Sequence, residues 1–206
     1  MSKSDLAVIL SKLKGFPFPN VALEQYTTDA DVAAEIVWDA YMNKDIEGKT
    51  LTDLGCGPGI LGIGAMIMNA MNVCFVDKDE MAIKIAQSNL RMVEEHLSEG
   101  FEGAEFFTMD VTEFFTPVDT IIMNPPFGTR DAGADVLFLG RAMAIAKTVY
   151  SLHKSSTKAY IRDLIAKNGF TIFYEKEFKM PLKATMPQHV KKIERIDVVC
   201  FGMRKK

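Results

Sequence analysis

The sequence predicts an α/β fold in which helices cover both faces of a mainly parallel β-sheet. Strand-like and helix-like segments alternate along most of the 206 residues, which is the pattern of repeated β-α units. A glycine-rich segment, residues 53–60, follows the first of these strands. The last two strands have no helix between them, which indicates an antiparallel hairpin at the edge of the sheet.

Apolar periodicity and capping residues predict the individual elements. Leu6, Ile9 and Leu10 recur with helical spacing, so a short N-terminal helix capped by Ser4 is expected, and Thr28 is expected to cap a second helix. Further helices are expected over residues 59–69, 80–97, 135–149 and 156–167. Strands are expected over residues 50–54, 72–76, 105–108, 118–123, 170–178 and 193–201.

Composition indicates an ordinary globular protein. The length suits a single domain over residues 1–206, and 48% hydrophobic with 25% charged residues excludes a disordered chain. No apolar run of about 18 residues predicts a membrane span. The first residues carry no signal-like apolar segment. The three cysteines are far apart, which argues against a disulfide framework and a metal site and favours the cytoplasm.

Charge is distributed unevenly along the chain. Residues 151–206 contain 13 Lys and Arg but only 5 Asp and Glu, although the net charge of the whole chain is −3. A basic C-terminal quarter can form a phosphate-binding surface. A solvated lysine-rich face is the alternative, and charge alone does not decide between them.

The glycine-rich segment reads Asp53-Leu-Gly-Cys-Gly-Pro-Gly-Ile60. Gly55, Gly57 and Gly59 allow a sharp turn and a close approach of the backbone to a ligand at the carboxyl edge of the sheet. No Gly-Lys-Ser/Thr follows, so a P-loop is excluded. A plain strand-to-helix turn is the alternative.

Acidic residues near this turn indicate the type of cofactor. Asp77 ends the second strand, where a carboxylate can accept the ribose hydroxyls of an adenosine cofactor. Asp53 would repel a pyrophosphate but suits an ammonium and a sulfonium, which favours S-adenosyl-L-methionine over NAD. Asp110 follows the third strand, where it can meet the adenine of the cofactor or simply cap a turn.

A second motif, Asn124-Pro-Pro-Phe-Gly128, follows the strand at 118–123. Its two prolines end the strand and make the chain rigid. Asn124 offers a side-chain carbonyl, Pro125 a backbone carbonyl and Phe127 a flat ring. Two fixed acceptors and a ring predict a site for a planar molecule that carries an amino group. A rigid turn after a buried strand is the alternative.

Together the two motifs resemble the class I methyltransferases that modify exocyclic amines or amides. Three segments narrow the resemblance: Leu23-Glu-Gln-Tyr-Thr-Thr28, Asn124-Pro-Pro-Phe-Gly-Thr-Arg130 and Tyr150-Ser-Leu-His-Lys-Ser-Ser156. With these, almost the whole chain is similar to the ribosomal RNA adenine-N6 methyltransferases shared by archaea and eukaryotes. The segment 131–135 departs from the more basic sequence usual in that family.

The resemblance implies a Rossmann-like, seven-stranded fold and methyl transfer from S-adenosyl-L-methionine to N6 of an adenosine in small-subunit ribosomal RNA. Residues 1–28 would form the N-terminal helix and a segment that closes over the cofactor. The expected cofactor-binding residues are Gln25, Thr28, Asp53, Gly55, Gly57, Pro58, Gly59, Ile60, Asp77, Asp110 and Val111. The expected catalytic residues, which hold the base, are Asn124, Pro125, Pro126 and Phe127. His153, Lys154, Lys191 and Lys192 are the expected RNA contacts, with a structural role as the alternative for His153.

Other functions remain open at this point. A related enzyme could act on a protein glutamine or on DNA adenine, although the chain offers little room for a separate recognition domain. An NAD-dependent oxidoreductase would have no use for the Asn-Pro-Pro-Phe motif, and a non-catalytic RNA-binding protein would not need both motifs intact. Eukaryotic members of the resembled family pair with a small zinc-binding activator protein, which is a further expected partner.

Overall fold

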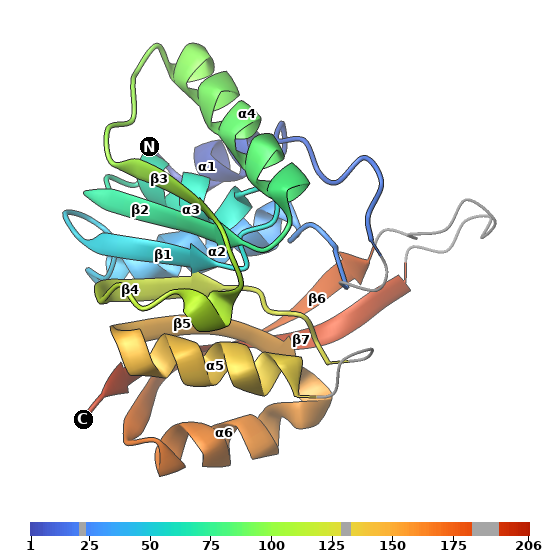
Figure 1. The fold of residues 1–206 in the computed structure, drawn as a ribbon, viewed down its shortest axis with the longest axis vertical. Helices are drawn as coiled ribbons and strands as arrows, with labels where there is room; N and C mark the ends of the chain where they lie inside the picture. The colour runs from blue at the N-terminus through green and yellow to red at the C-terminus, as the bar shows by residue number, and fades with distance from the viewer. Residues whose placement is uncertain (21–23, 129–132, 183–193) are drawn as a thin grey trace.

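The structure is a computed structural model that describes residues 1–20, 24–128, 133–182 and 194–206. Its centre is a seven-stranded sheet in the order β3-β2-β1-β4-β5-β7-β6 (Figure 1). The strands are β1 (Thr50–Leu54), β2 (Asn72–Asp77), β3 (Ala104–Thr108), β4 (Val118–Met123), β5 (Ala146–Lys154), β6 (Phe170–Leu182) and β7 (Glu194–Lys205). Strands β1 to β5 pair in parallel, whereas β7 is antiparallel to both β5 and β6. The predicted α/β fold with an antiparallel hairpin at the edge is therefore confirmed.

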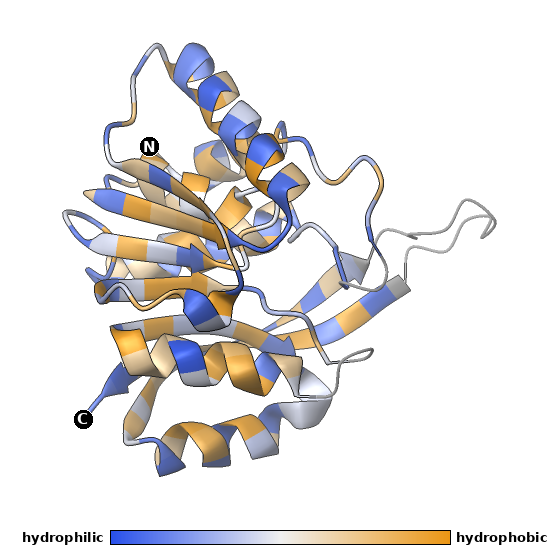
Figure 2. Cartoon of the chain, in the orientation of Figure 1, coloured by the Kyte–Doolittle hydropathy of each residue, from blue (hydrophilic) through white to orange (hydrophobic). Residues whose placement is uncertain are grey.

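Helices cover both faces of the sheet. They are α1 (Lys3–Leu10), α2 (Ala30–Met42), α3 (Ile60–Ile67), α4 (Glu80–Leu97), α5 (Ala134–Ile145) and α6 (Lys158–Lys167), with short 3-10 turns η2 (Val111–Glu113) and η3 (Ser155–Thr157). Apolar residues of α1 to α4 pack on one face, and those of η2, α5 and α6 pack on the other. Figure 2 shows the apolar strands between these two layers and the polar outer side of α4. Within the described ranges, no helix combines the length and apolarity needed to cross a membrane.

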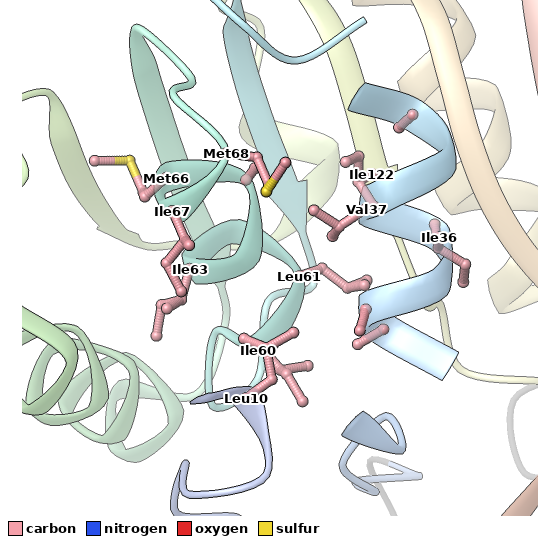
Figure 3. Packing of buried hydrophobic residues seen from close by; sticks show 14 of the residues in the cluster. Leu10, Ile36, Val37, Ile60, Leu61, Ile63, Met66, Ile67, Met68 and Ile122 are labelled. Carbon is pink, nitrogen blue, oxygen red and sulfur yellow. The ribbon is translucent and has the colours of Figure 1, made fainter. Parts of the chain in front are cut away.

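Helix α3 is the most deeply buried helix and carries the glycine-rich turn at its start. Each of its residues is buried, and Figure 3 shows Ile60, Leu61 and Ile63 among side chains of α1 and α2. Gly62 lies so close to β2 that a Cβ there would be 2.3 Å from Cε1 of Phe75. Because a real side chain cannot fit at that distance, Gly62 lets α3 pack directly against the sheet.

Two predicted helix caps are wrong by one or two residues. Ser2, not Ser4, caps α1, because its side chain accepts from the amide of Asp5 while the Asp5 carboxylate accepts from the amide of Ser2. Asp29, not Thr28, caps α2 through its own carboxylate. The side chain of Thr28 is therefore available for another contact.

The predicted helix over residues 135–149 is correct only as far as Ile145. The chain turns at Ala146 and forms β5, which lies between β4 and β7. From Thr148 to His153 β5 is buried on both faces, so its sequence lacks the alternation of a half-buried strand. His153 and Lys154 consequently lie at the carboxyl end of a central strand and not after a helix.

Candidate active site

A cavity opens at the carboxyl ends of β1, β2 and β4, which is the edge where open α/β sheets bind ligands. Of the residues expected to bind a cofactor, it is lined by Gln25, Thr28, Asp53, Gly55, Gly57, Pro58, Ile60, Asp77, Asp110 and Val111. Gly59 is the exception, because it supports the turn from behind: its amide donates to the carbonyl of Cys56 over 2.8 Å. The structure thus brings ten residues from four separate sequence segments to one cavity.

The turn before α3 depends on glycine for both conformation and space. Gly55 has a φ of +74°, and a Cβ there would lie 2.6 Å from Cε1 of Phe138. Gly57 has a φ of +52°, and its Cβ would lie 3.1 Å from Cζ of Phe16. These two rings line the cavity, although the sequence did not identify either of them as a site residue.

Two acidic side chains face the same cavity. Asp53 is 2% exposed, and one of its oxygens accepts the amide of Gly62 over 2.8 Å. Burial, and to a smaller extent the charge of the nearby Asp77, together raise the pKa of Asp53 to about 8, although the Gly62 hydrogen bond acts in the opposite direction. Burial also raises the pKa of Asp77, whose oxygens accept the amides of Gly57 over 2.8 Å and Asp79 over 2.9 Å. A cationic ligand would stabilise the charged forms of both carboxyl groups.

Two further predicted residues have defined roles at the rim. Asp110 caps η2, since its Oδ1 accepts from the amide and the hydroxyl of Thr112, and the amide hydrogen bond lowers its pKa. Asp110 also lines the cavity, so the same residue caps a turn and lies where a cofactor contact was expected. Gln25 donates to Oδ2 of Asp79 over 2.6 Å, which ties the segment before α2 to the start of α4.

The Asn-Pro-Pro-Phe loop borders this cavity. Asn124 and Pro126 line it directly. Nδ2 of Asn124 donates to Oγ1 of Thr28 over 2.9 Å, which leaves the side-chain oxygen of Asn124 facing the same region as the carbonyl of Pro125. The two oxygens that the sequence predicts as acceptors for a base therefore lie side by side.

Tyr26 contacts both acceptors, and the sequence had not identified it as a site residue. Its hydroxyl donates to the carbonyl of Pro125 over 3.0 Å and to Oδ1 of Asn124 over 3.2 Å. Its ring stacks on Phe127, with ring centroids 5.1 Å apart and an angle of 22° between the planes. The available signal was its place between Gln25 and Thr28, which were both expected at the cofactor.

The expected RNA contacts differ in position. Lys154 lies with its Nζ 5.9 Å from the centre of the Phe127 ring, beside the Asn-Pro-Pro-Phe loop. His153 is fully buried, with Nε2 2.8 Å from the hydroxyl of Ser151 and Nδ1 3.8 Å from a carboxylate oxygen of Asp135. The structure does not present His153 to a ligand, which agrees with its structural alternative. Lys191 and Lys192 lie outside the described residues.

Part of the positive charge of the C-terminal quarter is paired within the protein. Lys158 contacts Glu175 at 2.7 Å and Glu177 at 2.6 Å, and Arg204 contacts Asp45 at 2.8 Å. Arg162 and Lys176 also pair with carboxylates. Glu175 and Glu177 are already among the five acidic residues of this segment, so only the pairs of Lys176 and Arg204, with carboxylates outside it, offset part of its charge excess.

Comparisons with known proteins show the family of the chain. Residues 27–154 match the model of the methyltransferase small domain. The chain belongs to this family. The relatives of this family member include the rRNA N(6)-adenosine-methyltransferase METTL5 of Danio rerio, 34% identical over 96% of each chain. An uncharacterized protein of Methanocaldococcus jannaschii is 32% identical over 100% of this chain and 95% of its own. A solved structure from Pyrococcus horikoshii has 38% identity and a TM-score of 0.89 over 98% of both chains.

Proposed function

We propose that this protein transfers a methyl group from S-adenosyl-L-methionine to N6 of an adenosine in ribosomal RNA, and that the RNA is that of the small subunit. The observation that carries the proposal is the acceptor pair, Asn124 Oδ1 and Pro125 O, beside a cavity lined by the buried Asp53 and the half-buried Asp77. Relatives from Danio rerio and Drosophila melanogaster, both named rRNA N(6)-adenosine-methyltransferase, match 96% and 92% of the chain at 34% identity.

The cavity has the chemistry that this cofactor needs. Asp53 is buried with a raised pKa, so an ammonium or a sulfonium would gain by pairing with its carboxylate. Asp77 is held in place by two backbone amides and can still accept ribose hydroxyls through its remaining lone pairs. Phe138, Val111 and Ile60 supply apolar walls. Within this cavity Gln25 and Thr28 would close over the cofactor as part of the segment 1–28.

The acceptor pair would activate the adenine nitrogen. N6 of adenine is a weak nucleophile because its lone pair is delocalised into the ring. When Asn124 Oδ1 and Pro125 O each accept one N6 hydrogen, the nitrogen is drawn towards a tetrahedral arrangement, and its lone pair turns towards the cofactor. Phe127 would stack on the base, a contact worth about 1–3 kcal/mol.

When bound, the cofactor would supply a methyl group attached to a sulfonium sulfur. As N6 bonds to this methyl group, the methyl–sulfur bond would break, and the sulfur would leave as a neutral thioether. The residues of the protein hold the nitrogen in line with that methyl group, and positioning of this kind contributes up to about 7–11 kcal/mol. The two oxygens also stabilise the positive charge that develops on N6. The extra proton on N6 then passes to solvent, so no strong general base is required.

The RNA would reach the site with the target adenosine unstacked, since N6 inside a helix is inaccessible to this cavity. Lys154 lies beside Phe127 and would contact a phosphate next to the target. Lys191 and Lys192 are proposed as further RNA contacts on the evidence of the sequence alone. We also propose that the RNA substrate comes from the small ribosomal subunit, that the protein acts in the cytoplasm, and that a small zinc-binding activator protein is its partner.

Product analysis tests the proposed function. The protein is incubated with S-adenosyl-L-methionine labelled in its methyl group and in vitro transcribed small-subunit ribosomal RNA, and the RNA is digested to nucleosides. We expect the label in N6-methyladenosine. Parallel reactions contain double-stranded DNA or a ribosomal protein mixture. Label in DNA adenine or protein glutamine, with none in RNA, would replace the proposal by one of the alternative substrates.

A further inference from the structure

The acceptor pair of the proposed base site already has a partner within the chain. Tyr26 donates its hydroxyl to Pro125 O over 3.0 Å and to Asn124 Oδ1 over 3.2 Å. The same side chain lays its ring on Phe127, 5.1 Å between centroids. Tyr26 therefore occupies both hydrogen-bond acceptors and the stacking ring that the proposed function assigns to the target adenine.

Adenine and Tyr26 cannot use these features together. The carbonyl of Pro125 and the side-chain oxygen of Asn124 would have to direct their lone pairs at N6, and the base would have to stack on the face of Phe127 that Tyr26 covers. Tyr26 must therefore leave before the base is seated.

We propose that Tyr26 is a placeholder for the target base: it occupies the base site until an adenine displaces it, and it thereby sets which bases enter. This inference rests on the proposed function and adds a specificity-determining residue to it.

Hydrogen-bond counting explains the selection. A hydroxyl has one hydrogen, so the two acceptors share it in the structure, whereas an unmethylated amine has two and gives each acceptor its own. Adenine thus gains a hydrogen bond when it replaces Tyr26. A base with a keto oxygen at this position would leave both acceptors unpaired, which is unfavourable in a buried site. The N6-methylated product keeps one hydrogen, the same number as Tyr26, so Tyr26 can replace it after transfer.

The surroundings keep Tyr26 ready for this exchange. Gln25 is fixed to Asp79, and Thr28 is fixed to Asn124, so the backbone is held on both sides of Tyr26. In this arrangement Tyr26 would leave the base site by rotation of its side chain. Burial raises the pKa of Tyr26 well above its usual value, so the hydroxyl remains a donor at physiological pH.

Kinetics of Tyr26→Phe test the placeholder role. This variant keeps the ring but removes the hydroxyl, so the base no longer competes with a hydrogen bond. We expect the KM for small-subunit ribosomal RNA to fall about fivefold, the effect of one neutral hydrogen bond. The inhibition constant of fully methylated product RNA should fall by the same factor. The single-turnover rate at saturating RNA should stay within about twofold, because Tyr26 has left before the transfer step.

The matched control is Tyr160→Phe, which removes the hydroxyl of an exposed tyrosine on α6 and should leave all three values unchanged. An unchanged or raised KM in Tyr26→Phe, with N6-methyladenosine still formed, would overturn the placeholder role and leave the proposed function standing. Absence of N6-methyladenosine with the wild-type protein would instead overturn the proposed function.

A binding measurement tests the placeholder role even if the wild-type protein forms no N6-methyladenosine. The protein is labelled with 3-fluorotyrosine and saturated with S-adenosylhomocysteine, and the fluorine signal absent from Tyr26→Phe is assigned to Tyr26. Adenosine 5′-monophosphate at millimolar concentration should shift this signal, and inosine 5′-monophosphate should not. No shift with the adenine nucleotide, or an equal shift with both, would contradict the placeholder role.

Discussion

Nδ2 of Asn124 donates a hydrogen bond to Oγ1 of Thr28 over 2.9 Å, which fixes the orientation of the Asn124 amide. A side-chain amide can present either its oxygen or its nitrogen to a given neighbour. Because Thr28 takes the nitrogen, the oxygen of Asn124 lies beside the carbonyl of Pro125, where both contact Tyr26. Thr28 is buried and comes from the segment before α2, about 96 residues away in sequence.

Thr28→Val removes the acceptor but keeps the shape of the side chain. We expect kcat for methyl transfer to fall about tenfold, because an Asn124 amide without a fixed orientation would raise the activation free energy by roughly 1.4 kcal/mol. The Kd for S-adenosyl-L-methionine should change less than threefold, and Thr28→Ser should restore most of the activity. A Thr28→Val enzyme with wild-type kcat would show that the Asn124 amide needs no such support.

The stability of the protein should depend on pH through Asp53. The pKa of Asp53 is about 8 in the folded protein, raised first of all by burial, whereas an ordinary aspartate has a pKa of 3.8. Between these two values the folded state retains a proton that the unfolded state has lost, so this group stabilises the fold at acid pH and the effect declines as pH rises. We expect the free energy of unfolding of wild type relative to Asp53→Asn to fall by up to about 1.4 kcal/mol per pH unit from pH 5 to 8.

Urea denaturation of both proteins at pH 5, 6, 7, 8 and 9 measures this difference. It should level off above about pH 8, where Asp53 is ionised in both states. A difference that is flat between pH 5 and 8 would mean that Asp53 keeps its charge in the folded protein.

Gly55 tests the requirement for space at the cofactor turn. Gly55→Ala places a Cβ 2.6 Å from Cε1 of Phe138 and also strains a backbone with a φ of +74°. Gly48→Ala is a matched control, since its φ is +67° and nothing lies within 4 Å of the added Cβ. We expect Gly48→Ala to cost about 1 kcal/mol of stability.

Gly55→Ala should cost more than Gly48→Ala in thermal unfolding and should also weaken binding of S-adenosyl-L-methionine in calorimetry at least tenfold. Equal effects of the two substitutions on stability would indicate that Phe138 moves aside without cost. Unchanged cofactor binding would separate Gly55 from the proposed cofactor site.

Lys154 and Lys147 provide a paired test of RNA binding. Both lie on β5, but Lys154 is at the carboxyl end beside Phe127, whereas Lys147 is near the opposite end, 3.9 Å from Asp119. Lys154→Ala should weaken binding to small-subunit ribosomal RNA and reduce the slope of log K against log salt by about 0.7–0.9, the effect of one phosphate contact. Lys147→Ala should leave that slope unchanged in filter-binding titrations. Equal slopes for the two variants would remove Lys154 from the interface.

The sequence predicted the parts of the fold that have strong local signals. Glycine positions predict the turn before α3, helical periodicity predicts the long α4, and the lack of a helix between the last two strands predicts the final hairpin. The positions of all three along the chain agree with the structure. Strand β5 was missed because it is buried on both faces, so its sequence does not alternate, and because it follows α5 without a helix-breaking residue. The caps of α1 and α2 were misplaced because several adjacent polar residues can each cap a helix.

Contacts between distant segments explain what the sequence did not reveal at the site. Phe16 and Phe138 reach the cavity from the N-terminal segment and from α5, and neither belongs to a motif. The role of Tyr26 depends on its hydrogen bonds to a loop about 99 residues away. His153 was expected as an RNA contact, with a structural role as the alternative, because its strand was interpreted as the end of a helix; its side chain lies in the core.

Asn124→Ala tests the acceptor pair most directly. The variant is compared with wild type and with Asn168→Ala, a surface asparagine after α6, in transfer of labelled methyl groups to small-subunit ribosomal RNA and in calorimetry of S-adenosyl-L-methionine. We expect cofactor affinity within about threefold of wild type and a loss of N6-methyladenosine formation of about 100-fold or more, the typical effect of removing one transition-state hydrogen bond. Formation of N6-methyladenosine by Asn124→Ala at the wild-type rate would contradict the proposed role of the two oxygens.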